Sequence, residues 1–260
     1  MLSEYSEIEM KEKIFDKEEF IFEGMVSISA VINSEIKCRK ITKILFDRDK
    51  IKSKKKQYDY LKAMSQSHGF DIELTDEKTL DSLTVGTTHG GVIAYCTDRK
   101  IEEITTDDIK DGGFYVYIEG IEDPYNFGYA LRSLYASGVD GVILSPRNWM
   151  TAAATVCRAS AGASERCPLF TSSDDMIDIF KSKGYKVVCA GIRDSVSAYD
   201  ADLKKPVLLI VGGEKRGISS SLLQNADTVV RLDYGREFMQ SLSAASAAGI
   251  LAFEVLRQNR

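Results

Sequence analysis

The sequence is poor in the residues that many hydrolytic and metal-dependent sites require. It has only two histidines, His68 and His89, and both lie in its first half. Its five cysteines are an odd number without a Cys-x-x-Cys pair, which argues against a disulfide framework and a zinc ribbon and favours a reducing compartment. No apolar run approaches the roughly 18 residues of a membrane-spanning helix, and the acidic first ten residues are unlike a signal peptide. We therefore expect a cytoplasmic protein without a metal ion or a membrane segment.

Proline is also scarce, and its distribution divides the chain. All four prolines follow residue 123. A length of 260 residues favours two domains, and a hydrophobic content of 44% with 28% charged residues is typical of globular proteins. The expected organisation is an N-terminal extension at 1–19, a small domain at 20–97, a highly charged linker at 98–113 and a larger domain at 114–260.

The small domain is predicted to be an α/β sandwich with one strongly basic segment. Helical patterns cover 27–34 and 53–69, and strand patterns cover 41–47, 71–77 and 91–96. Segment 36–62 has eleven Lys and Arg against three Asp, a local charge of +8, although the whole chain carries −5. Such a segment is either a solvated face or a contact surface for a polyanion.

The larger domain has continuous apolar strands between helices, which is typical of a mainly parallel sheet covered on both faces. Ligands of such sheets bind beyond the carboxyl ends of the strands. The loops after Glu119, Val211 and Leu232 are therefore the candidate site. Because both histidines precede this domain, its chemistry must use arginine, glutamate, hydroxyl groups or the substrate itself.

The first loop, EGIEDPYNFGYALRS at 119–133, joins a turn to a helix. Asn126 is expected to cap this helix. Arg132 stands four residues after Gly128, whose missing side chain leaves room beside it on the same helix face. The alternative is a capped helix with a surface arginine.

The second and third loops are rich in small residues. The second, VGGEKRGISSSL at 211–222, lacks the lysine of a P-loop and any G-x-G-x-x-G, but its glycines let a ligand approach the backbone closely. A plain strand-to-helix turn would also explain them. The third loop leads into the alanine-rich helix that Ser241 is expected to cap. The small residues of this helix are expected to allow tight packing in the core or in a dimer. This packing would occur whether or not the helix also contacts a ligand.

Taken in order, DPYNFGYALRS, VGGEKRGIS and SLSAASAAGILAFE resemble the three motifs of the SpoU/TrmH-type RNA 2'-O-ribose methyltransferases of the SPOUT superfamily. The resemblance covers 114–258, and residues 20–97 look like the small ribosomal-protein-like substrate-binding domain of many members. It implies a deep trefoil knot, an S-adenosylmethionine cofactor, a homodimer, and an rRNA or tRNA substrate methylated on a ribose 2'-hydroxyl.

The resemblance also implies roles for single residues. The catalytic candidates are Asn126, Arg132, Glu214 and Ser241. The cofactor-binding candidates are Val211, Gly212, Gly213, Leu232, Leu242 and Ser243. With a polyanionic substrate implied, the basic segment is expected to contact RNA through Lys37, Arg39, Lys40, Lys54, Lys55 and Lys56.

The chain departs from the family pattern in two places. It has Leu232-Asp233-Tyr234 where members usually have Ile-Pro-Met, and Ser241-Leu242-Ser243 where they have Ser-Leu-Asn. The departures concern the shape of the cofactor loop and one polar contact.

A fixed Arg132 fits the implied chemistry, since a ribose hydroxyl is a poor nucleophile and its developing alkoxide charge needs stabilisation. Arg132 would act as that stabiliser or as a proton relay. Two alternatives stay open. One is an RNA-binding module of the same fold with weakened or lost catalysis, and the other is a base methyltransferase of a related branch.

Overall fold

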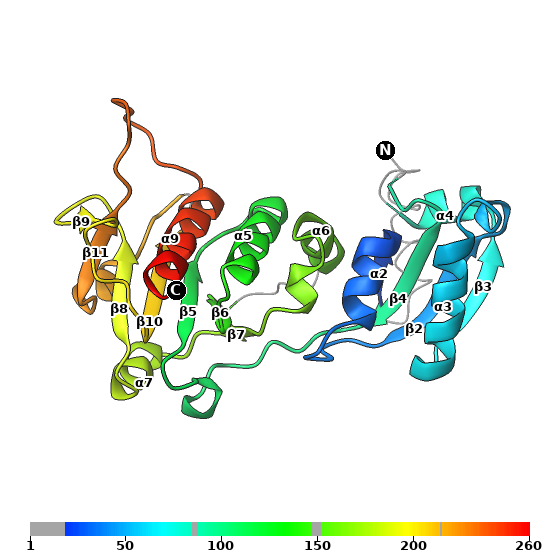
Figure 1. Cartoon of the computed structure of the whole chain (residues 1–260), viewed down its shortest axis with the longest axis horizontal. Coiled ribbons are helices and arrows are strands. Elements are labelled where there is room, and N and C mark those ends of the chain that lie inside the picture. The colour runs from blue at the N-terminus through cyan, green and yellow to red at the C-terminus, as the bar shows by residue number, and fades with distance from the viewer. Residues whose placement is uncertain (1–18, 85–87, 147–151, 214) are drawn as a thin grey trace, which may run out of the picture. The chain divides into compact units, whose positions relative to one another are not determined.

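The structure is a computed structural model that describes residues 19–84, 88–146, 152–213 and 215–260 (Figure 1). The chain forms two compact units, Met1–Lys100 and Ile101–Arg260. The division falls inside the predicted linker. Ile104 and Ile109 are buried in the core of the second unit, and Glu103 forms a bridge with Thr171, so the second half of that segment belongs to the larger unit.

The small unit is an α/β fold around a four-stranded sheet of order β1-β4-β2-β3. Its elements are β1 (Glu19–Glu23), α2 (Gly24–Ile32), β2 (Ile41–Asp47), η1 (Arg48–Lys50), α3 (Lys55–His68), β3 (Asp71–Thr75), α4 (Glu77–Leu83) and β4 (Val92–Thr97). Strands β2 and β3 are parallel, whereas β4 runs antiparallel to β1 and β2. The predicted α/β class is confirmed, although β1 and the polar α4 were not expected from the sequence.

The large unit is built on a seven-stranded sheet of order β7-β6-β5-β10-β8-β11-β9, in which neighbouring strands pair in parallel. Its strands are β5 (Phe114–Glu119), β6 (Gly141–Leu144), β7 (Leu169–Thr171), β8 (Lys186–Ala190), β9 (Val196–Ser197), β10 (Val207–Gly212) and β11 (Thr228–Arg231). The predicted parallel sheet is confirmed.

Helices cover both faces of this sheet, as its apolar strands predicted. Its helical elements are η2 (Thr106–Asp108), α5 (Pro124–Ala136), α6 (Ala153–Ala159), η4 (Ala163–Glu165), α7 (Met176–Ser182), α8 (Ser220–Gln224) and α9 (Ala244–Gln258). In β5, Phe114, Val116 and Ile118 join the core under α5 and α9, whereas Tyr115 and Tyr117 join the core under α7 and α8. The implied knot stays a prediction, because strand order alone does not define a threading.

Helix α9 lies beside α5 on one face of the sheet (Figure 1). Its small residues allow this close approach: Ala244, Ala245 and Ala248 are buried, and a Cβ on Gly249 would come within 3.1 Å of the Ser133 Cβ. The thin helix predicted from the sequence therefore packs tightly within the large unit. The segment between β11 and α9 extends beyond the carboxyl edge of the sheet.

Candidate active site at the carboxyl edge of the parallel sheet

Helix α5 begins directly after the loop that leaves β5. Asp123 is its N-cap, because the Asp123 carboxylate accepts a hydrogen bond from the Asn126 backbone N–H at 2.8 Å, and Pro124 occupies the first helical position. The expectation that Asn126 caps the helix is therefore wrong. Asn126 instead lies in the first turn, where its side chain is half-buried.

Gly128 serves helix packing. A Cβ at this position would lie 2.5 Å from the Ala159 Cβ and 3.0 Å from the Ser160 backbone nitrogen, so α6 occupies the space that the sequence suggested for a neighbour of Arg132. Arg132 itself is exposed on α5. Within the described ranges its guanidinium has no hydrogen-bond or ion-pair partner, so it is available to a ligand or to another chain.

The loops that follow β5 and β10 are packed backbone to backbone. A Cβ on Gly213 would lie 2.3 Å from the Gly120 carbonyl oxygen, and one on Gly212 would lie 2.3 Å from the Gly217 carbonyl carbon. The Ser219 N–H also donates to the Glu119 carboxylate at 2.8 Å. The close approach at Gly213 and the Ser219 hydrogen bond therefore hold the two loops together, whereas the close approach at Gly212 is within the second loop. Glu214 lies outside the described residues.

The third motif lines a cavity of about 380 Å³ at the same edge of the sheet. Leu232 and Leu242, the cofactor-binding candidates, contribute to its wall together with Ser241, a catalytic candidate. Gly191 and Ile192, which follow β8, also line it, although the sequence did not single them out. The signal was present, since the rule about carboxyl ends of parallel strands applies equally to β8.

Not every predicted residue lines this cavity. The described lining does not include Val211, Gly212, Gly213 or Ser243, nor does it include Asn126 or Arg132 of α5. Val211 is buried within β10, Gly212 is the last residue of that strand, and Gly213 follows it directly. In a single chain, the third motif and the end of β8 thus line the same cavity. Arg132 lies on the exposed surface of α5, outside that cavity.

Both departures from the family pattern contribute hydrogen bonds in the third loop. Ser243 is the N-cap of α9, since its hydroxyl oxygen accepts from the Ser246 N–H at 3.2 Å, so the prediction that Ser241 caps this helix is wrong. The Leu242 N–H donates to the Tyr234 hydroxyl oxygen at 3.2 Å. Hydrogen bonds from the Ser197 hydroxyl and then from Arg231 lower the pKa of Asp233, so this carboxylate is ionised at neutral pH.

The capping geometry makes a prediction for Ser243. The variant Ser243→Asn is expected to change the free energy of unfolding by less than about 0.5 kcal/mol, because asparagine caps helices as well as serine does. Methyl transfer should stay unchanged or fall, since the larger side chain competes with Tyr234 for space near Leu242. Ser243→Ala, the matched control, should lose about 1 kcal/mol of stability. Thermal unfolding and a methyl-transfer assay check this, and a clear gain of activity in Ser243→Asn would contradict it.

The cavity has the chemistry that S-adenosylmethionine requires. Its volume falls within the range of small-molecule sites, and Leu232, Leu242 and Phe238 provide apolar surface for an adenine ring. The ionised Asp233 carboxylate and the Arg231 guanidinium, which pair at 2.9 Å, both line the cavity and add polar groups for the charged amino-acid end of the cofactor. The residues present therefore fit the cofactor.

The cysteines of the large unit do not supply a nucleophile. Cys157, Cys167 and Cys189 are buried, as expected for Cys157 and Cys167, and burial raises the pKa of the Cys189 thiol to about 12. No cluster of His, Cys, Asp or Glu suited to a metal ion occurs in the described part of the chain. None of its helices in those ranges has the length and apolar character needed to cross a membrane.

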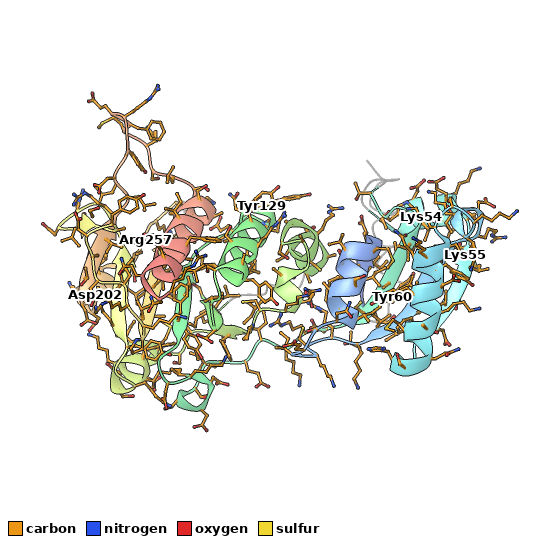
Figure 2. All side chains as sticks on the ribbon, viewed as in Figure 1. Lys54, Lys55, Tyr60, Tyr129, Asp202 and Arg257 are labelled. Atoms are coloured by element: carbon orange, nitrogen blue, oxygen red, sulfur yellow. The ribbon has the colours of Figure 1, made fainter. Side chains whose placement is uncertain are left out.

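The six basic residues predicted to contact RNA lie at two ends of the small unit. Arg39 donates to the Thr97 carbonyl oxygen at the end of β4, whereas the Lys54 ammonium donates to the Gly90 carbonyl oxygen just before β4 begins. Six residues of strand separate these ends by about 20 Å. Lys37 and Lys40 flank Arg39, and Lys55 and Lys56 continue from Lys54 into α3 (Figure 2 labels Lys54 and Lys55). The segment 36–62 is thus not one continuous patch.

Both units are similar to known proteins. The model of the SpoU rRNA Methylase family matches residues 113–253, and that of the RNA 2'-O ribose methyltransferase substrate binding domain matches residues 21–101. A Shewanella oneidensis protein named 23S rRNA (guanosine-2'-O-)-methyltransferase RlmB is 31% identical over 202 residues, which cover 75% of this chain and 82% of that protein. A Bacillus subtilis protein named Putative TrmH family tRNA/rRNA methyltransferase YacO is 25% identical and covers 90% of this chain and 95% of its own length.

Solved structures agree with these sequence matches. The AdoMet-bound rRNA methyltransferase from Sinorhizobium meliloti superposes with a TM-score of 0.76 at 25% identity, covering 93% of this chain and 88% of that one. The methyltransferase AviRb from Streptomyces viridochromogenes, in complex with AdoMet, shares the fold with a TM-score of 0.77 at 20% identity, covering 94% and 92%. The resemblance predicted from the three motifs and from residues 20–97 is confirmed.

Proposed function

Because the chain belongs to the SpoU rRNA methylase family, we propose that it methylates the 2'-hydroxyl of a guanosine in 23S rRNA. The coarser activity, transfer of a methyl group from S-adenosylmethionine to an RNA ribose, follows from the two matched domains and from relatives with bound cofactor. The choice of 23S rRNA rests on the names of several of the relatives. The observation that carries the proposal is the cavity where the third motif meets the end of β8.

The site residues divide the work between binding and charge stabilisation. S-adenosylmethionine, when bound, supplies an electrophilic methyl group on a sulfonium. The ribose 2'-hydroxyl would receive this methyl group, and its proton would pass to solvent, directly or by way of Arg132. Arg132 would stabilise the developing negative charge on O2', and Asn126 and Glu214 would orient Arg132 or the ribose. Leu232 and Leu242 would hold the cofactor within the cavity.

Mapping of ribose methylation tests the substrate. In rRNA from cells with and without the protein, one guanosine of 23S rRNA should be resistant to alkaline cleavage only when the protein is present. The purified protein should restore this resistance in rRNA from the deficient cells when S-adenosylmethionine is added. A protein-dependent site in tRNA with none in rRNA would overturn the proposed substrate. Cofactor and RNA binding without any methylated site would instead support the binding-module alternative, and an alkali-sensitive methylated nucleotide would indicate a base methyltransferase.

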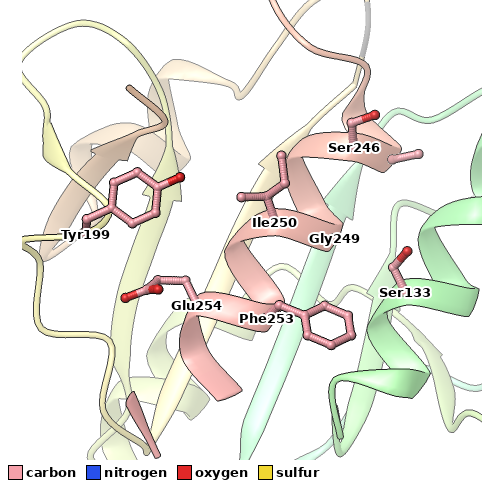
Figure 3. A pocket seen from close by; sticks show the side chains of 8 residues that line it. Ser133, Tyr199, Ser246, Gly249, Ile250, Phe253 and Glu254 are labelled. Atoms are coloured by element: carbon pink, nitrogen blue, oxygen red, sulfur yellow. The ribbon is translucent and has the colours of Figure 1, made fainter. Parts of the chain in front are cut away.

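We also propose that the protein is a homodimer in which the exposed surface of α5 and α9 is covered by a second copy. Ile250 and Phe253 of α9 are 41% and 46% exposed, and they border a hollow with Ser133 of α5 and with Tyr199 (Figure 3). Tyr129 of α5 is also exposed (Figure 2). Contiguous exposed apolar side chains of this kind mark protein interfaces. Such an interface would also bring a second chain close to the exposed Arg132.

The dimer predicts the effect of trimming its apolar side chains. Phe253→Ala should raise the dimer dissociation constant about tenfold, because an aromatic side chain buried in an interface typically contributes more than 1 kcal/mol. Leu74→Ala is the control, since Leu74 is 47% exposed but belongs to the small unit. Sedimentation equilibrium measures both variants. A wild-type protein that stays monomeric at micromolar concentration, or equal effects of the two substitutions, would contradict this arrangement.

We propose the cytoplasm as the place of action. All five cysteines are free thiols, and four of them are buried, as suits a reducing compartment that also holds the RNA substrate.

A further inference from the structure

The small unit contains a cavity that methyl transfer itself does not use. It has a volume of about 390 Å³ and lies between the end of α2, the start of β2 and the end of α3. Its lining is part basic and part apolar, with Lys37, Lys40 and His68 on one hand and Ile32, Ile41 and Phe70 on the other. Asp and Glu are absent from the described lining. This combination suits a ligand that has both an anionic group and a flat apolar group.

Lys37 has an unusual backbone conformation. Its φ angle is +46°, in the left-handed region that a residue with a side chain adopts at an energetic cost. The side chains of Lys37 and Lys40 are exposed, and in the described parts of the chain neither ammonium has a hydrogen-bond or ion-pair partner. The cavity therefore has two unpaired cations on a loop with an unusual backbone.

Arg39, between these lysines, has a structural role. It is buried, its guanidinium lies 5.1 Å from the centre of the Phe22 ring, and it donates to the Thr97 carbonyl oxygen at 2.9 Å. A carboxylate oxygen of Asp98 lies 3.7 Å away. Arg39 thus fixes the loop to the end of β4, which leaves the two flanking lysines to meet a ligand.

Three of the basic residues at the opposite end of β4 are already engaged. The Lys50 ammonium pairs with the Glu77 carboxylate at 2.6 Å, and Lys55 pairs with Asp59 at the same distance. Lys54 donates to the Gly90 carbonyl oxygen. An anionic ligand would have to compete with these partners, whereas Lys37 and Lys40 need no such exchange. Lys52 and Lys56 at that end are exposed and likewise have no partner in the described ranges, so what distinguishes Lys37 and Lys40 is the cavity that they line.

We propose that this cavity binds one unstacked nucleotide of the substrate RNA. Its base would lie against Ile32, Ile41 and Phe70, and its phosphate would be bound by Lys37 and Lys40. Single-stranded RNA is recognised in this way, by apolar or aromatic surfaces for bases and cations for the backbone, whereas a duplex keeps its bases stacked inside. The inference rests on the proposed function, because that function makes RNA the ligand. It adds a capture site apart from the methyl-transfer site.

The two histidines of the chain provide the test. His68 lines the cavity, whereas His89 is buried at the other end of β4, where its Nδ1 accepts from the Gly91 N–H at 3.0 Å. In the full-length protein, a single-stranded adenylate decamer should shift the ring resonances of His68 in a saturable way and leave those of His89 unchanged. The same concentration of inorganic phosphate should give less than a quarter of the His68 shift, because it has no base.

Matched variants show how much Lys37 and Lys40 contribute to the affinity for the decamer. Lys37→Gly with Lys40→Ala should raise the dissociation constant of the decamer about tenfold. It should also reduce the slope of log Kd against log salt concentration by about 0.7, the value for one lost phosphate contact on a single strand. Glycine tolerates the left-handed conformation at position 37, so this variant should fold. Lys78→Ala with Lys204→Ala removes the same charge elsewhere and should change the constant less than twofold.

Several outcomes would overturn the proposal. The first is a shift of the His89 resonances by the decamer without a shift of those of His68. The second is a His68 shift with phosphate alone as large as that with the decamer. The third is a loss of decamer affinity in Lys55→Ala with Lys56→Ala equal to that in the Lys37 and Lys40 variant. These results concern decamer binding, so they can be told apart from failure of the proposed function. That failure would appear as absent methylation of 23S rRNA by a protein that still binds the decamer at His68.

Discussion

Replacing Arg132 with alanine is expected to lower the rate of methyl transfer by a hundredfold or more. Loss of one group that stabilises developing negative charge typically costs about 2.7–4 kcal/mol of transition-state stabilisation. The affinity for S-adenosylmethionine should change less than twofold, because Arg132 is not among the residues that line the cofactor cavity. Single-turnover methylation of rRNA and calorimetric titration with the cofactor measure the two effects separately.

Two controls make the Arg132 result specific. Arg260→Ala removes an exposed arginine at the C-terminus and should leave the rate unchanged. Arg132→Lys keeps the charge but loses the planar fork of donors, so its rate should lie between those of the wild type and the alanine variant. Sedimentation should show that the oligomeric state is retained, since α5 borders the proposed interface. Full turnover in Arg132→Ala would remove this residue from the mechanism.

Gly213→Ala is expected to destabilise the large unit strongly. The new methyl group would lie 2.3 Å from the Gly120 carbonyl oxygen, and backbone atoms cannot turn aside as a flexible side chain can. We expect a loss of about 2–3 kcal/mol in the free energy of unfolding, at the upper end of the usual cost of overpacking. In the folded variant the affinity for S-adenosylmethionine should change less than twofold, because neither the loop after β5 nor the loop after β10 lines the cofactor cavity.

Gly235→Ala is the matched control for Gly213→Ala. The space around Gly235 is open, with no heavy atom within 4 Å of an added Cβ, although the residue also lies in a loop at the carboxyl edge. Its stability should change by less than about 0.5 kcal/mol. Thermal unfolding and cofactor titration check both variants. A Gly213→Ala protein as stable as the Gly235→Ala protein would show that the two loops are not held together by their close approach.

The sequence predicted the sheet well where its strands are long and apolar. The strand at Ile41–Asp47 was expected with these bounds, and the apolar β10 was also expected. The short strands Leu169–Thr171 and Val196–Ser197 were missed because two or three residues cannot show a periodic pattern. Their pairing depends on neighbours that are distant in sequence.

Within the site, sequence motifs located the loops but not their contacts. Leu232 and Leu242 were assigned to the cofactor by resemblance, and both line the cavity. Gly191 was not singled out, although it follows a strand of the parallel sheet; the strand order then shows that the end of β8 lies next to β11. The sequence placed the N-cap of α5 at Asn126, but Asp123 is the cap, and it placed that of α9 at Ser241, but Ser243 is the cap. Capping depends on where the first helical N–H groups point, which the sequence does not show. Segment 36–62 was predicted to form one basic surface. The sequence does not show that its first lysines lie at one end of β4 and Lys54 at the other.

The central position of β10 in the sheet also affects how the chain can fold during its synthesis. Phe114 of β5 pairs with Val207 of β10, which is made 93 residues later. At typical bacterial or eukaryotic rates of about 5–20 residues per second, the ribosome needs roughly 5–20 s to make that stretch. Throughout this interval β5 can pair with β6 on one side only, and its other edge exposes the apolar run from Phe114 to Ile118. The nascent large unit thus exposes an unpaired apolar strand edge for several seconds, and such an edge is a surface that chaperones bind.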